Sequence, residues 1–238
     1  MSIILTAAML VLVAVHLTAG RLHVRDPLRR TSWLSFAGGV SVTYVFLELL
    51  PEMAEAQHVL AGEVAALEFL EHHVYLVALA GLAAFYGIET WVRNRRRSEV
   101  PASDESDSVF WIHIGAFAVY NVLVGYLMVE REPYEQHLPA YTIAMALHFV
   151  VTDFGLRSHH DTLWERKGRF VLAAAIAAGY ALGLQAQVPE AFVSVIAAVV
   201  AGGAILHVMK EELPEENASR FAPFLTGVVI ASILLAIR

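Results

Sequence analysis

Apolar residues recur along this chain in long windows, and short polar stretches separate them. A bilayer core about 30 Å thick needs about 20 apolar residues per helix. Windows of that length come at roughly 2–19, 33–50, 73–92, 109–129, 139–156, 169–187, 190–210 and 219–237. Nothing positive precedes the first window, so we interpret it as a retained helix rather than a signal peptide. The pattern therefore predicts an all-α membrane protein with eight transmembrane helices.

Basic residues cluster after every second window. Of the 16 Lys and Arg residues, 14 follow the first, third, fifth and seventh windows, and only Arg131 and Arg238 fall elsewhere. Lys and Arg near the ends of spans stay in the cytoplasm. Both termini are therefore predicted to lie outside the cytoplasm, in a cell (inner) membrane. Segment 98–108, which contains Pro101, is predicted to be a short flexible cytoplasmic linker.

Composition narrows the chemistry that is open to the chain. It has 238 residues, of which 58% are hydrophobic and 16% charged, and this nearly excludes an ordinary soluble enzyme. It has no cysteine, so any metal must be held by His, carboxylate, Asn or carbonyl ligands. The net charge of −7 argues against nucleic acid as a partner. The outer segment after the second window is acidic, which suits either a solvated helix or a mouth that gathers cations.

The second and seventh windows resemble each other. Segment 38–52 aligns without a gap with segment 201–215, and the two share a Gly, a Val, a Glu and a final Leu-Pro-Glu. The distribution of basic residues gives the two windows opposite directions, and inverted repeats are typical of transporters. The predicted organisation is one membrane domain with a 3+2+3 arrangement: a first repeat at 1–97, central helices four and five within 109–156, and a second repeat at 168–238.

Ionisable groups inside a membrane are unfavourable, so those within the windows are functional candidates. On the two central helices we predict a metal site formed by Asn121, His148 and Asp153. His148 and Asp153 are about 140° apart on a straight helix. Their convergence on one ion therefore needs Asn121 from the neighbouring helix, a kink or a bridging water. The alternative is a buried hydrogen-bonded trio that only fixes helix packing.

Other polar residues are candidates for the pathway of an ion or a proton. Tyr44 shares a helix face with Glu48, and His207 shares one with Glu211, because each pair is four residues apart. The alternative for both pairs is anchoring at the membrane interface. Glu89 is expected to be an ion-pair partner. The pathway candidates are His113, Thr152, Glu48, His207 and Glu211.

This arrangement resembles the ZIP (Zrt-, Irt-like) family of divalent-metal transporters. The resemblance is clearest at Phe85-Tyr86-Gly87-Ile88-Glu89 and in the two aligned segments. It implies that residues 120–125 occupy the family motif H-N-x-x-[DE]-G and residues 148–155 the motif H-E-x-P-H-E-x-G. Most of the family's ligands are replaced, and Asn121, His148 and Asp153 are those carried over. The chain thus resembles a divergent branch with a depleted metal motif, which would hold one ion loosely.

The leading hypothesis is transport of a divalent cation of the zinc, iron or manganese class by a protein that is not an enzyme. The metal ion is then the transported substrate, no organic cofactor is expected, and the lipid bilayer is the other partner; a homodimer is compatible with the sequence. Uptake should weaken as the pH falls, because protons compete for the ligands. One alternative is a ZIP-fold protein without metal transport, structural or regulatory. A less favoured one is an intramembrane metal-dependent hydrolase, which needs about three converging ligands.

Overall fold

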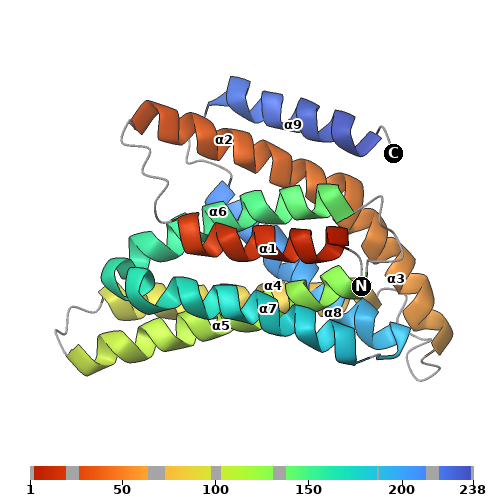
Figure 1. Ribbon diagram of the computed structural model, residues 1–238, viewed down its shortest axis with the longest axis horizontal. Helices are drawn as coiled ribbons and strands as arrows, with labels where there is room; N and C mark the ends of the chain where they lie inside the picture. The colour runs from red at the N-terminus through yellow and green to blue at the C-terminus, as the bar shows by residue number, and fades with distance from the viewer. Residues whose placement is uncertain are drawn as a thin grey trace.

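The computed structural model describes residues 3–19, 27–63, 73–97, 103–130, 138–186, 188–212 and 220–236, and every regular element within these ranges is a helix (Figure 1). Three of the elements, labelled η, are π-helical turns. In chain order the elements are α1 (Ile3–Thr18), α2 (Pro27–Tyr44), η2 (Val45–Leu49), α3 (Leu50–Glu63), α4 (His73–Arg97), α5 (Ser103–Glu130), α6 (Leu138–Leu163), η5 (Trp164–Gly168), α7 (Arg169–Gln185), α8 (Glu190–His207), η6 (Val208–Glu212) and α9 (Phe221–Ala236).

Each of the eight predicted windows coincides with a helix, so the all-α prediction is confirmed for the described residues. Six helical stretches are long and apolar enough to cross a bilayer, and the apolar helices α1 and α9 are shorter. The six stretches are Thr31–Gln57, His73–Arg95, Ser108–Glu130, Leu138–Arg157, Trp164–Gln185 and Glu190–Lys210.

The helices extend beyond the apolar windows. The prediction of a flexible linker over 98–108 is wrong for its second half, because α5 begins at Ser103. The polar segment between the fifth and sixth windows is also helical, since α6 continues through η5 into α7. Each residue added to an existing helix gains a backbone hydrogen bond, so a helix that begins in an apolar window continues into polar residues. Hydropathy therefore located the apolar part of each helix and not its ends.

Three pairs of helices approach closely at glycines: α2 with α9, α4 with α8, and α5 with α7. A Cβ atom on Gly39 would lie 2.2 Å from the backbone oxygen of Phe224, and one on Gly202 would lie 2.0 Å from that of Ala78. In the third pair, a Cβ atom on Gly179 would lie 2.0 Å from the backbone oxygen of Val122. Small residues that let helix backbones approach are typical of helix packing in membranes.

The first two pairs are each parallel. At the start of α9, the backbone N–H of Arg220 donates to Ser35 Oγ in α2 over 3.2 Å. From this point both helices continue in the same direction to the glycine crossing. Figure 1 shows α2 and α9 side by side along the top edge. In the other pair, Glu89 near the end of α4 contacts Lys210, just after the end of α8.

The two aligned segments run in opposite directions. Residues of α3, including Met53, line one cavity together with Ala197 and Ala198 from the first half of α8. At the other end, η6, which follows α8, contacts α2, which precedes α3. The start of one segment therefore lies near the end of the other.

Candidate functional site

Three buried polar side chains from three helices meet in the interior, and we call them the central triad. They are His16 of α1, Asn121 of α5 and Asp153 of α6, and each is at most 1% exposed. His16 Nδ1 lies 3.0 Å from Asp153 Oδ1 and 3.1 Å from Oδ2, while its Nε2 lies 2.8 Å from Asn121 Oδ1. His16 therefore links the two central helices.

The surroundings of the triad fix the orientation of its hydrogen bonds. The Nδ2 group of Asn121 donates to the backbone oxygen of Phe117 over 2.7 Å, so the amide oxygen must face His16. The two ring nitrogens of His16 thus face side-chain oxygens, those of Asp153 on one side and that of Asn121 on the other. The ring of Phe149 covers His16 with 4.6 Å between ring centroids. The triad is therefore a buried hydrogen-bonded group in which His16 joins the Asp153 carboxyl group to the Asn121 amide.

His148, the third predicted metal ligand, lies beside the triad and contacts Phe149, whose ring covers His16. Its Nε2 is 3.5 Å from Tyr120 Oη, and its ring centroid is 5.6 Å from that of His207. The structure thus brings together Asn121 and Asp153, through His16, and turns His148 toward α8. Among the residues that the structure describes, no group of three or more His, Asp or Glu side chains is placed to hold a metal ion.

A small cavity lined by both polar and apolar side chains lies next to the triad, and we call it the Glu89 cavity. Its volume of about 30 Å³ has room for about two water molecules. Thr152 Oγ1 and both ring nitrogens of His207 are buried and make no hydrogen bond within the described part of the chain. The lining residues are Glu89, Val92, Arg93, His113, Phe117, Thr152, Gly155, Leu156 and His207.

Charged and imidazole groups surround this cavity. Glu89 accepts a hydrogen bond from the Lys210 ammonium at Oε2, and its Oε1 lies 3.6 Å from His207 Nε2. The ion-pair role expected for Glu89 is therefore observed, with Lys210 as the partner. His113 lies apart from the triad, and its Nδ1 is 2.9 Å from Nε2 of His160. Three of the predicted pathway residues, His113, Thr152 and His207, thus line one cavity.

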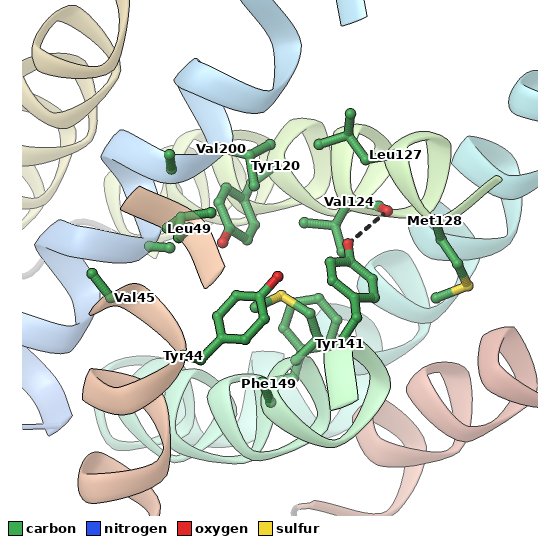
Figure 2. Packing of buried hydrophobic residues seen from close by; sticks show 14 of the residues in the cluster. Tyr44, Val45, Leu49, Tyr120, Val124, Leu127, Met128, Tyr141, Phe149 and Val200 are labelled. Atoms are coloured by element: carbon green, nitrogen blue, oxygen red, sulfur yellow. Dashed lines mark hydrogen bonds between the residues drawn. The ribbon is translucent and has the colours of Figure 1, made fainter. Parts of the chain in front are cut away.

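A second cavity, near the other end of α5, is mainly apolar. Tyr44, Leu127, Tyr141 and Met145 are among its lining residues, and Glu52 is its one ionisable carboxylate. Figure 2 shows the dense apolar packing around it, with the Tyr141 hydroxyl donating to the Val124 backbone oxygen over 3.1 Å.

One predicted pathway residue, Glu48, lines neither cavity, and another, Glu211, is described only in its backbone. Glu48 lies in η2 and is half-buried, whereas the buried Tyr44 precedes it at the end of α2. The backbone of Glu211 belongs to η6, and its side chain lies outside the described residues.

His16 was not among the residues that the sequence predicted for the site. A signal was present, because His16 is the one ionisable residue in the apolar helix α1. An ionisable residue inside an apolar span is a candidate by default. Attention to the two central helices alone left it out.

The comparisons with known proteins are negative: no family model and no curated protein matches this chain.

Proposed function

We propose that the protein is an integral membrane carrier for a divalent cation of the zinc, iron or manganese class. The observation that carries the proposal is the set of polar side chains enclosed by apolar helices, from the central triad to the Glu89 cavity. Large apolar side chains on the outer surface, such as Ile3 at 87% and Phe192 at 63% exposure, support a lipid environment. An ionised group inside a membrane costs about 2.5–3.5 kcal/mol or more, so a cluster of them suggests a function.

The geometry of the two aligned segments supports an inverted repeat. The alignment that places 38–52 above 201–215 also places η2 above η6, so both segments contain a π turn at the same position. The glycine crossings correspond as well. A Cβ atom on Gly227 would meet the backbone oxygen of Phe36, and one on Gly81 would meet that of Val199, which the same alignment makes equivalent. Such repeats underlie alternating access in carriers.

The ion path in this proposal passes the predicted ligands Asn121, His148 and Asp153. In the described arrangement His16 occupies the space between Asn121 and Asp153. An entering cation would take this place once His16 has turned away. The resemblance to the ZIP family points to the same three residues.

Uptake into proteoliposomes tests the proposal. Purified protein is reconstituted, and entry of Zn²⁺ or Mn²⁺ is followed with an enclosed fluorescent chelator. We expect Asp153→Asn and His148→Ala to reduce the initial rate at least about tenfold, because each removes a ligand group. Thr142→Ala is the matched control in α6, since Thr142 is buried but only donates to the backbone oxygen of Leu138. Wild-type rates in both ligand variants would refute the assignment of these residues.

The closed hydrogen bonding of the central triad favours one other candidate, a ZIP-fold protein without metal transport. A histidine that bridges a carboxylate and an amide can serve only to fix helix packing. In that case the wild-type protein would show no divalent-cation uptake above that of protein-free vesicles. The same assay therefore separates the two candidates.

A further inference from the structure

His207 is a buried imidazole that has no hydrogen-bond partner among the described residues. It is 4% exposed, and neither of its ring nitrogens makes a hydrogen bond to a residue that the structure describes. Buried polar groups are nearly always paired, so an unpaired one that lines a cavity requires an explanation. The ring lines the Glu89 cavity, where a ligand can reach it.

The distance from His207 to Glu89 fits an intervening metal ion. His207 Nε2 lies 3.6 Å from Glu89 Oε1, which is too long for a hydrogen bond. Zinc binds imidazole nitrogen and carboxylate oxygen at about 2.0–2.2 Å, and two such ligands in a tetrahedral arrangement lie about 3.4 Å apart. The two atoms are therefore spaced nearly as they would be across a bound ion.

The ammonium group of Lys210 already pairs with the Glu89 carboxylate. The Lys210 ammonium donates to the other oxygen of Glu89, and its Nζ also lies 5.3 Å from the centre of the Tyr86 ring. The aromatic face offers the ammonium a favourable contact when it moves away from Glu89. We propose that Glu89 and His207 form a binding site for a divalent transition-metal ion, and that Lys210 competes with the ion for Glu89.

The rest of the cavity indicates how tightly the ion would be held. Only two protein ligands are in place, and water fills the other positions in a space with room for about two molecules. Structural zinc sites have four protein ligands, so this site suits an ion that exchanges readily. Arg93 also lines the cavity and, with Lys210, adds positive charge that weakens cation binding.

Cobalt titration of the purified full-length protein in detergent tests this site. Co²⁺ reports nitrogen and oxygen ligation through its visible absorption, and Zn²⁺ competes for the same ligands. We expect Lys210→Met to bind Co²⁺ about tenfold more tightly than the wild type, because one competing positive charge is removed. Lys167→Met is the matched control. Lys167 is the only other lysine in the chain, and it lies over Trp111 rather than beside Glu89.

Ligand variants complete the test. Glu89→Gln and His207→Gln should each weaken Co²⁺ binding at least about tenfold. Glu165→Gln should bind like the wild type, since Glu165 pairs with Arg157 and Arg169 instead. Equal affinity in the two lysine variants, or unchanged binding in both ligand variants, would overturn the site. The test includes an expected gain of affinity in Lys210→Met and therefore does not depend on a loss alone.

The site is distinguishable from the proposed function because binding is measured without a membrane gradient. If the protein binds Co²⁺ through Glu89 and His207 but moves no ion into vesicles, the proposed binding site is supported and the proposed carrier function is refuted. If the protein moves ions but the Glu89 and His207 variants bind Co²⁺ like the wild type, the carrier function is supported and the proposed binding site is refuted.

Discussion

The carboxyl groups of the buried Asp153 and the partly buried Glu89 each lie against a basic side chain. Asp153 contacts His16, and Glu89 contacts Lys210, with His207 on its other side. Such pairs can be close to neutral for stability as a whole, yet the loss of one partner leaves a buried charge without compensation.

The pair of His16 and Asp153 gives a prediction for stability. We expect His16→Leu to lower the free energy of unfolding by about 3–5 kcal/mol, because Asp153 is left buried and unpaired. The double variant His16→Leu/Asp153→Leu should recover much of that loss, since no charge then remains. Reversible unfolding in mixed micelles measures both values. Destabilisation that is additive in the double variant would show that the two residues do not act as a pair.

At the level of elements, glycines decide which helices pair. Gly39 and Gly227 meet the opposite backbone where α2 crosses α9, and Gly81 and Gly202 do so where α4 crosses α8. A side chain at any of these positions would overlap a backbone atom. The pairing of α4 with α8 in turn places Glu89 next to His207, so the Glu89 cavity depends on this crossing.

Alanine substitution tests the crossing of α4 with α8. A Cβ atom on residue 202 would lie 2.0 Å from the Ala78 backbone oxygen, so the helices must separate. We expect Gly202→Ala to destabilise the protein by about 1–3 kcal/mol or more, as overpacking does. Gly87→Ala is the control, because a Cβ atom there would meet nothing within 4 Å. Thermal unfolding in detergent compares the two, and equal melting temperatures would contradict the close approach.

Across the whole molecule, equivalent backbone positions carry different chemistry at the two ends. The alignment of the two segments pairs Tyr44 with His207, and each residue lines a cavity. The lining of the cavity at His207 includes two charged residues and two histidines, whereas the lining at Tyr44 includes one carboxylate among mostly apolar residues.

The orientation itself can be tested by cysteine labelling, because the chain has no native cysteine. Asn94→Cys and Gln185→Cys each place one thiol at an exposed position, at the ends of α4 and α7. The positive-inside rule predicts that Gln185→Cys reacts with an impermeant maleimide in intact spheroplasts and that Asn94→Cys reacts only after permeabilisation. The opposite pattern would invert the predicted orientation.

The sequence by itself determined where the helices lie and that polar groups are enclosed among them. Hydropathy locates the helices because the apolar residues of each window indicate a buried or membrane-embedded helix, whatever the neighbouring windows contain. Asn121 and Asp153 were selected on this ground, and the repeat was visible because the two aligned segments share residues in register. The ends of the helices were less predictable, as α5 shows, because helix propagation does not stop where hydrophobicity stops.

Only the tertiary structure decided which polar groups meet. His16 is more than 100 residues from both Asn121 and Asp153, and no local pattern relates it to them. Glu89 meets His207 because glycine crossings bring α4 against α8, and the spacing of residues in sequence carries no trace of that contact. Side-chain contacts between distant helices depend on the packing of the whole molecule, whereas helix formation depends mainly on neighbouring residues.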